Sequence, residues 1–163
     1  LSVLKKDSTE ITDADREKIF HAVFNVANEN IIITHGTDTI YQTAQKLAGG
    51  GVQNKKIILI MGGADKALDM SELADEIPNR CKDVVFLKET GTEKFKNLID
   101  KNEWKGVQIE EAEKLSDCLA LSLKIAKRGD IILFSPAFAS FGKYFKNEYD
   151  RNDQFVSLVK KLK

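Results

Sequence analysis

The segment from His35 to Asp38 carries side chains whose types could do chemistry. Thr37 supplies a hydroxyl, the group of a covalent nucleophile, and Asp38 supplies a carboxylate that could hold a substrate ammonium group. Gly36 has no side chain, so a substrate could approach the backbone closely there. Threonine and aspartate also cap helices in ordinary strand–turn–helix connections, because they accept hydrogen bonds from the first helical N–H groups. The residues therefore fit either a reaction site or a structural turn.

Short apolar runs must position these residues, and they alternate with helical patterns along the chain. Runs rich in β-branched residues and bounded by polar ones are typical of strands covered on both faces. The alternation predicts an α/β fold: a single domain with a three-layer, Rossmann-like parallel sheet and helices on both faces. The predicted strands are Leu1–Leu4, Ile31–Ile33, Lys56–Met61, Val84–Leu87, Gly106–Ile109 and Ile131–Phe134.

Helix start and stop signals fill the intervals between these runs. Thr12–Asp15 and Asp69–Glu72 both fit a capping box, and Pro78 is expected to stop the helix that follows the second one. The predicted helices are one following Thr12, 39–47, 69–77, one capped by Thr90–Glu93, 110–128 and 153–162.

Polar and glycine residues follow several of the predicted strands. Because ligands of open parallel sheets bind beyond the carboxyl ends of the strands, we expect these residues to share one rim. They are Ser8, Thr37, Asp38, Gly62, Gly63, Lys66, Thr90 and Ser135.

The composition excludes several classes of function. The 25 basic and 25 acidic residues cancel, so no net field attracts nucleic acid or an anionic membrane. No apolar run approaches the roughly 20 residues of a membrane span, and the first residues do not read as a signal peptide. Cys81 and Cys118 lack metal-ligand or redox spacing. We therefore expect a cytoplasmic protein with two free thiols, no metal and no cofactor.

The first part of the chain, from about Val3 to Leu47, resembles short, single-domain asparaginase-like amidohydrolases. Two motifs carry the resemblance: DSTEIT at Asp7–Thr12 before a capped helix, and ITHGTDT at Ile33–Thr39 after a strand. The resemblance implies a related α/β fold for this segment.

The same resemblance assigns roles to three residues. Ser8 would contact the substrate carboxylate, Thr37 would belong to the catalytic threonine set, and Asp38 would belong to the amino-group site. The chain has no TGGTI-type loop with the family's other nucleophilic threonine, and it has IMGGADK where the family has a TGAM-like sequence. Thr37 and Asp38 are therefore interpreted as vestigial, and no intact catalytic set is predicted.

The rest of the chain resembles the C-terminal domain of Mur ligases, specifically the enzymes that add D-glutamate during peptidoglycan precursor synthesis. Four segments carry the resemblance in the right order. They are LIMGGADKALDMSELADEI at 59–77, VVFLKETGTEKF at 84–95, KRGDIILFSPAFASF at 127–141 and FKNEYDRNDQF at 145–155.

This second resemblance implies a site for an amino-acid substrate. Lys66 matches a lysine that pairs with a substrate carboxylate, and lysine is a flexible point charge suited to that role. Ser140 and the backbone around Phe141 match the element that holds the other carboxylate. The alternatives are a solvated turn lysine and a strand exit held by packing.

The chain departs from the ligase pattern in several places. His35–Asp38 replaces a DS-x-x-T-like string, the segment 141–147 is one residue longer than usual, and Asn152 stands where glycine is common. The chain also has no G-x-x-x-x-G-K-[ST] phosphate loop, so ATP-driven ligation is not expected from this chain alone.

Together the two resemblances predict a spliced chain joined near Gly49–Gly51. The leading hypothesis is an engineered chimera without catalytic activity, a single α/β domain built from an asparaginase-like segment 1–50 and a ligase-like segment 51–163.

Two alternatives stay open. The first is the D-glutamate-binding C-terminal domain of a UDP-N-acetylmuramoyl-L-alanine:D-glutamate ligase, with Lys66 and Ser140 as binding residues. The second is residual asparaginase-type hydrolysis at Thr37. The expected partner is a small dicarboxylate or amino acid bound weakly, with no nucleic acid and no membrane.

Overall fold

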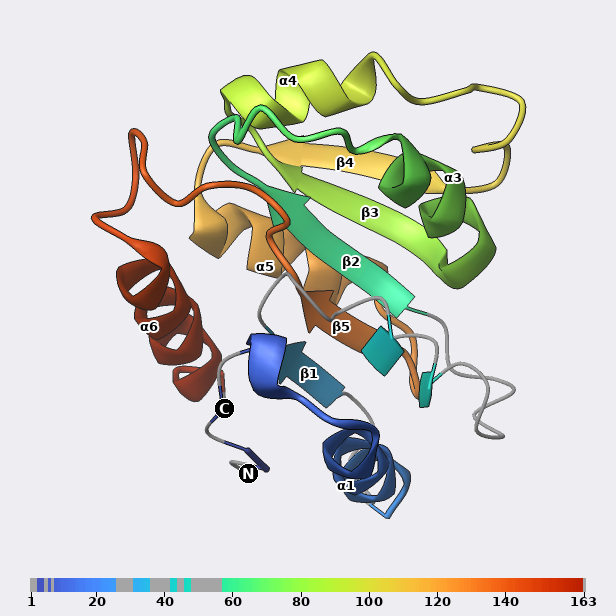
Figure 1. Ribbon diagram of the computed structural model, residues 1–163, viewed down its shortest axis with the longest axis vertical. Helices are drawn as coiled ribbons and strands as arrows, with labels where there is room; N and C mark the ends of the chain where they lie inside the picture. Colours follow the sequence, from blue (N-terminus) through green and yellow to red (C-terminus); the bar gives the residue numbers. More distant parts are fainter. Residues whose placement is uncertain are drawn as a thin grey trace.

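A parallel β-sheet forms the centre of the protein (Figure 1). The computed structural model describes residues 3–4, 6, 8–25, 31–35, 42–43, 46–47 and 57–162. Within these residues, five strands are hydrogen-bonded in the order β1-β5-β2-β3-β4, and every neighbouring pair is parallel. The strands are β1 (Ile31–Thr34), β2 (Ile57–Gly62), β3 (Cys81–Leu87), β4 (Gln108–Ala112) and β5 (Ile131–Phe134).

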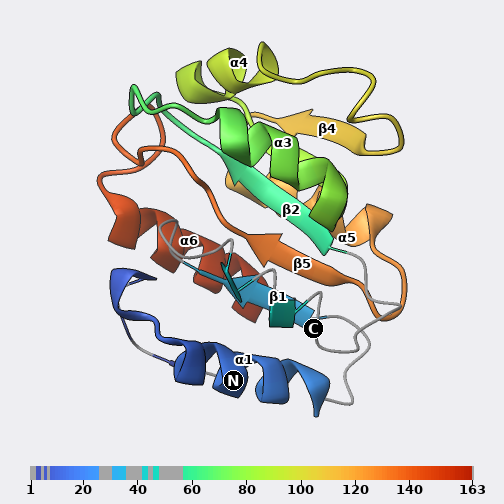
Figure 2. The same ribbon diagram turned by 45° about the vertical axis from the view of Figure 1, so that its right-hand side comes forward.

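Helices cover both faces of this sheet (Figures 1 and 2). Clusters of buried side chains place α1, α3 and α4 against one face and α5 and α6 against the other. The predicted three-layer α/β fold is therefore confirmed. The helices are a short 3-10 turn η1 (Ser8–Glu10), α1 (Asp13–Phe24), α3 (Ser71–Arg80), α4 (Thr90–Lys96), α5 (Leu115–Ile125) and α6 (Glu148–Lys160).

Strand β2 shows why a continuous apolar run forms a central strand. Successive side chains of a strand point to opposite faces, so a strand covered on both sides must be apolar throughout. Ile57, Leu59 and Met61 pack with α3 and α4, while Ile58 and Ile60 pack with α5 and α6. All six residues of β2 are buried.

The edge strand β1 is covered on both faces, as its β-branched run predicts. Ile31 and Ile33 pack against the cluster that contains Ile19 and Val23 of α1, whereas Ile32 packs on the opposite side with the cluster of α5 and α6.

Helix α1 confirms the predicted capping box. The Thr12 hydroxyl accepts a hydrogen bond from the Asp15 amide (3.3 Å), and the Asp15 carboxylate accepts one from the Thr12 amide (3.2 Å). Lys6 Nζ also donates to Asp15 at 2.6 Å. These bonds, that of Lys6 above all, hold the pKa of the Asp15 carboxyl well below its usual range.

The boundary between β4 and α5 differs from the prediction, which gave a strand at Gly106–Ile109 and a helix over Glu110–Arg128. Glutamates favour helices when local propensity decides, but here the pairing with β3 decides. Glu110 and Ala112 continue β4, and Ala112 pairs with Leu87 at the end of β3. The strand therefore extends to Ala112, and α5 begins only at Leu115.

The starts of α4 and α6 also differ from the sequence predictions. The N-cap of α4 is Glu89, and no side chain of Thr90–Glu93 caps the helix. Helix α6 begins before the predicted range 153–162, because the Asn147 side chain accepts a hydrogen bond from the Asp150 amide at 2.8 Å.

The predicted capping box at the start of α3 is not formed. Met70 is the N-cap and makes no side-chain capping bond. The Asp69 carboxylate instead accepts hydrogen bonds from Ser71, one from its amide (3.0 Å) and one from its hydroxyl (2.7 Å). Aspartate commonly bonds the backbone two residues on in this way, which forms a turn before the helix.

The end of α3 overturns the prediction that Pro78 stops the helix. The helix continues to Arg80 with Pro78 inside it. Proline has no N–H to donate to the carbonyl four residues back, which belongs to Ala74. The indole Nε1–H of Trp104, a buried side chain, donates to this carbonyl at 3.0 Å. A contact distant in sequence therefore satisfies the group that proline leaves without an intrahelical partner.

This arrangement predicts a coupling between Pro78 and Trp104 in the free energy of unfolding. Trp104→Phe should destabilise the protein less in the Pro78→Ala variant, where the new amide bonds Ala74, than in the parent chain. We expect a coupling of about 1 kcal/mol, the usual net value of one hydrogen bond. Urea unfolding of the parent, both single variants and the double variant measures it. Equal effects of Trp104→Phe in the two backgrounds would contradict this account.

Other predicted elements fall partly outside the described residues. Of the predicted strand Leu1–Leu4, only Val3 and Leu4 are described; they have no regular secondary structure, and Leu4 packs with the α1 cluster. Of the predicted helix 39–47, residues 42, 43, 46 and 47 are described and are helical. The predicted junction Gly49–Gly51 lies outside the described residues. No helix in the described part of the chain has the length and apolar character to span a bilayer.

Candidate functional site

The loops that follow β2 and β5 run together past the carboxyl ends of the strands (Figure 1). We call residues 63–70 the β2–α3 loop and residues 135–147 the β5–α6 loop. The Gly62 amide donates to the Pro136 carbonyl at 2.8 Å. Ala64 and Ala139 then exchange two backbone hydrogen bonds, of 3.1 and 3.0 Å, as an antiparallel bridge. The bridge fixes the two loops against each other.

The N-terminal turn of α4 holds the β2–α3 loop from the other side. The Gly63 amide donates to the Thr92 hydroxyl (3.3 Å), and the Asp65 amide donates to the Thr90 hydroxyl (3.2 Å). The Asp65 carboxylate also pairs with Lys94, and this hydrogen bond is the main cause of the lowered pKa of Asp65. Thr90, expected from the sequence to cap α4, thus braces a neighbouring loop.

Lys66 extends from this braced loop into solvent. Among the described residues, no acidic side chain pairs with its ammonium group. The next residue, Ala67, has φ of 54°, a left-handed conformation that is unusual for a residue with a side chain. The chain therefore presents an exposed cation on a loop whose backbone is fixed at several points.

Ser140 and Phe141 lie in the β5–α6 loop, directly after the residue that pairs with Ala64. Ser140 is buried, and Phe141 is 68% exposed. Lys66 follows Ala64 by two residues, and because the bridge is antiparallel, Lys66 and the segment Ser140–Phe141 leave it in opposite directions and lie on either side of it. Lys66 and the Phe141 ring are accessible from solvent, with the Ser140 side chain behind the surface.

The other predicted site residues are less fully described. Ser8 lies in η1, which sits near the carboxyl end of β1 in both views, but its side chain is outside the described set (Figures 1 and 2). Thr37 and Asp38 lie outside the described residues altogether. Ser135, another predicted rim residue, is buried, and its hydroxyl has no hydrogen-bond partner in the described structure.

Two residues that the sequence reasoning missed hold the β5–α6 loop. Arg151 of α6 is 5% exposed, and its Nη1 donates to the Phe138 carbonyl at 2.8 Å. Burial lowers the pKa of this guanidinium to about 10, against the opposing charges of Glu148 and Glu89. The Glu89 carboxylate accepts a hydrogen bond from the Lys143 amide at 3.0 Å. Only the spacing of Arg151 and the buried Phe155, one helical turn apart, signals that Arg151 faces inward.

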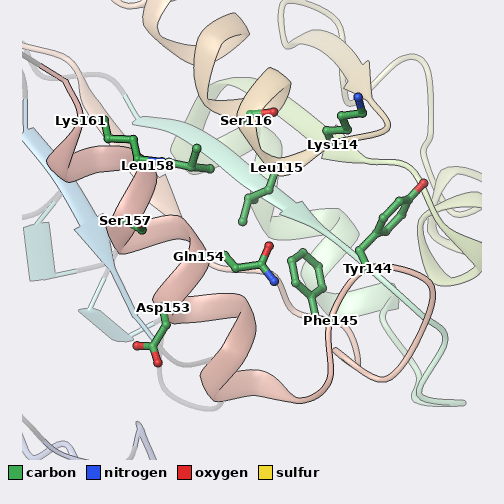
Figure 3. Close-up of a pocket in the computed structure, with 10 residues that line it drawn as sticks. All are labelled: Lys114, Leu115, Ser116, Tyr144, Phe145, Asp153, Gln154, Ser157, Leu158 and Lys161. Atoms are coloured by element: carbon green, nitrogen blue, oxygen red, sulfur yellow. The ribbon is translucent and has the colours of Figure 1, made fainter.

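A separate cavity of about 580 Å³ lies between the start of α5 and the part of α6 from Asp153 onward (Figure 3). Apolar side chains from α5, α6 and the β5–α6 loop alternate around it with lysine, serine and glutamine side chains. None of the site residues predicted from the sequence lines it. The lining residues are Lys114, Leu115, Ser116, Tyr144, Phe145, Asp153, Gln154, Ser157, Leu158 and Lys161.

Comparison with known proteins assigns the chain to a family. The family described as Mur ligase, glutamate ligase domain, matches residues 31–138. The match crosses the predicted junction Gly49–Gly51 and includes β1, so it does not support the splice. It ends just before Ser140 and Phe141.

Two curated proteins that are similar to this chain are both named as D-glutamate ligases. A UDP-N-acetylmuramoylalanine--D-glutamate ligase of Borreliella afzelii (strain PKo) is 40% identical over 106 residues, which cover 65% of this chain and 22% of that protein. The protein of the same name from Borreliella burgdorferi (strain ZS7) is 32% identical over 139 residues, 82% of this chain and 29% of its own length. The chain thus spans about a quarter of these relatives.

A solved domain from Haemophilus ducreyi 35000HP, named for a UDP-N-acetylmuramate:L-alanyl-gamma-D-glutamyl-medo-diaminopimelate ligase, is 14% identical with a TM-score of 0.47; it covers 78% of this chain and 91% of its own. The resemblance to the Mur ligase C-terminal domain, made from four segments between Leu59 and Phe155, is confirmed by the family match and the curated relatives. The chain belongs to the family of Mur ligase glutamate ligase domains.

Proposed function

We propose that this chain is the D-glutamate-binding domain of a UDP-N-acetylmuramoylalanine–D-glutamate ligase. The observation that carries the proposal is the exposed Lys66 ammonium on a loop braced by both the β5–α6 loop and α4. A carboxylate gains most from a cation whose backbone is already fixed, because less conformational freedom is lost on binding. The names of the curated relatives supply the identity of the amino acid.

In this proposal the domain binds and orients the amino acid. Lys66 attracts one carboxylate of D-glutamate, and the backbone around Ser140 and Phe141 holds the other. The amino group is then presented to an acyl phosphate formed on parts of the ligase that lie outside this chain. The chain spans about a quarter of its curated relatives, and the proposal assigns binding and orientation, not the complete ligation, to these residues.

The direct test is a titration of the ¹⁵N-labelled chain with D-glutamate, followed by NMR. We expect amide shifts around Lys66 and Phe141, and Lys66→Ala should raise the Kd about tenfold or more, because it removes a charge-assisted hydrogen bond. Lys105→Ala is the matched control: this exposed lysine precedes β4, at the opposite end of the sheet. Absence of shifts in the parent chain, or equal affinity after Lys66→Ala, would refute the proposal.

The two other functional hypotheses have less support. An engineered scaffold predicts a boundary near Gly49–Gly51, whereas the family match is continuous over residues 31–138. Residual amidohydrolase chemistry rests on Thr37 and Asp38 and on the motif at Asp7–Thr12. The ligase-domain proposal accounts for both the family match and the braced loop, and we therefore prefer it.

The cellular setting belongs to the same proposal. Cys81 and Cys118 are both free, and burial raises the pKa of each thiol to about 12. Free thiols fit a reducing compartment, which supports placement in the cytoplasm. The partner we propose is a small amino acid with two carboxylates.

A further inference from the structure

Glu89 follows β3 and is the N-cap residue of α4, yet its side chain does not cap the helix. The side chains that usually cap a helix from this position are those of serine, threonine, aspartate and asparagine, and the longer glutamate is not among them. The Glu89 carboxylate instead accepts a hydrogen bond from the amide of Lys143, which lies 54 positions further along the chain. The side chain is therefore used to connect α4 with the β5–α6 loop.

Gly142 makes room for this connection. A Cβ atom at Gly142 would lie 2.1 Å from Glu89 Oε1 and 2.9 Å from Glu89 Cδ, which is closer than atoms can approach. The carboxylate thus occupies the space that a side chain at position 142 would need. A Cβ atom here would force the flexible end of the Glu89 side chain to move, whereas the backbone of Gly142 has no positive φ.

The hydrogen bond between Glu89 and the Lys143 amide fixes the backbone on the C-terminal side of the segment Ser140–Phe141. Before this segment, Ala139 is paired with Ala64 and the Phe138 carbonyl is bonded by Arg151. After it, the amide of Lys143 is held by Glu89. The Phe141 side chain is largely exposed, and its backbone forms a further bridge with Phe145 inside the same loop, so backbone contacts at and around this residue set its position.

The charge of Glu89 is balanced by its surroundings. Burial lowers the pKa of Arg151, and the negative charge of Glu89 opposes this effect. The contact with Tyr144 raises the pKa of Lys143, and the charge of Glu89 adds to this effect. Two cations near Glu89 reduce its repulsion of an incoming dicarboxylate.

We infer that Glu89 is a positioning residue, whose carboxylate holds the β5–α6 loop so that the Ser140–Phe141 backbone is ready to receive a substrate carboxylate. The inference rests on the proposed D-glutamate site and adds a residue to it. Glu89 acts through the Lys143 amide without touching the ligand.

Three variants test this role. Glu89→Ala removes the acceptor, Gly142→Ala displaces the carboxylate without altering Glu89, and Glu89→Gln keeps an oxygen acceptor while removing the charge. NMR titration with D-glutamate gives the Kd of each variant, and amide hydrogen exchange reports the hydrogen bond of Lys143.

We expect faster exchange of the Lys143 amide and about tenfold weaker D-glutamate binding in Glu89→Ala and Gly142→Ala. Glu89→Gln should bind within about threefold of the parent, because its amide oxygen still accepts the bond. A merely structural role would lower the melting temperature of Glu89→Ala without this pattern of rescue.

The outcomes separate the inference from the function beneath it. If the parent binds D-glutamate and Glu89→Ala binds equally well while the Lys143 amide exchanges faster, the positioning role is overturned and the site stands. If Glu89→Gln binds as weakly as Glu89→Ala, charge and not loop position is responsible, and the inference also fails. If the parent does not bind D-glutamate, the proposed function is refuted, and the positioning role of Glu89 is refuted as well.

Discussion

Replacing Phe95 by alanine is expected to lower the free energy of unfolding by about 3–5 kcal/mol, the range for removal of a buried phenylalanine ring. Phe95 of α4 is 1% exposed, and its ring centroid lies 5.9 Å from that of Phe86, 6.0 Å from Phe138 and 6.3 Å from Trp104. Alanine would leave a cavity and remove three aromatic contacts at once.

Urea unfolding followed by circular dichroism measures this effect. Leu98→Ala is the control, because Leu98 lies just after the same helix and is 43% exposed, so its loss should be below about 1 kcal/mol. A similar loss in both variants would show that α4 is not fixed by the Phe95 ring. Because Phe138 belongs to the β5–α6 loop, Phe95→Ala should also loosen the proposed binding site.

Gly62→Ala is expected to have an effect of similar size for a different reason. Gly62 ends β2 with φ of +130°, which strains any residue that has a side chain. A Cβ atom there would also lie 2.3 Å from the Leu87 carbonyl oxygen and 2.7 Å from Thr92 Oγ1. Backbone strain and overpacking each cost about 1–3 kcal/mol, so we expect a loss of about 2–6 kcal/mol.

A second glycine separates these two causes. Gly106 has φ of +105°, but a Cβ atom there would meet nothing within 4 Å. Gly106→Ala should therefore show the backbone strain alone, at about 1–2 kcal/mol. Equal losses for Gly62→Ala and Gly106→Ala in chemical unfolding would mean that the close approach of β2 to β3 contributes nothing. A larger loss for Gly62→Ala supports the packing argument.

The strands could be predicted from the sequence because their burial leaves a local signal. The run Ile57–Met61 is apolar at every position and rich in β-branched residues, which is typical of a short strand covered on both faces. The boundary errors arise where distant contacts override local preference. Glu110 joins β4 because β3 pairs with it, and Pro78 stays inside α3 because Trp104 satisfies the Ala74 carbonyl.

The residues of the candidate site also fall into two groups, those that the sequence could predict and those that it could not. Lys66, Ser140 and Phe141 could be found because they stand in segments that resemble a family. Glu89 could not be found, because its contact with the Lys143 amide, 54 positions away, depends on how the start of α4 and the β5–α6 loop meet. Residues that support a site through another loop leave no local pattern to read.

The sheet order has a consequence for how the chain assembles. In the described sheet, β1 pairs only with β5, and Ile31 stands opposite Ile131, one hundred positions later. Strands β2, β3 and β4 are successive in both sequence and space, so they can associate while later residues are still being synthesised. Strand β1 must wait until β5 emerges, and closing so long a loop is slow. Among the five described strands, β1 is therefore synthesised earliest and is among the last to find its neighbour, and until then its isoleucines are exposed to other chains.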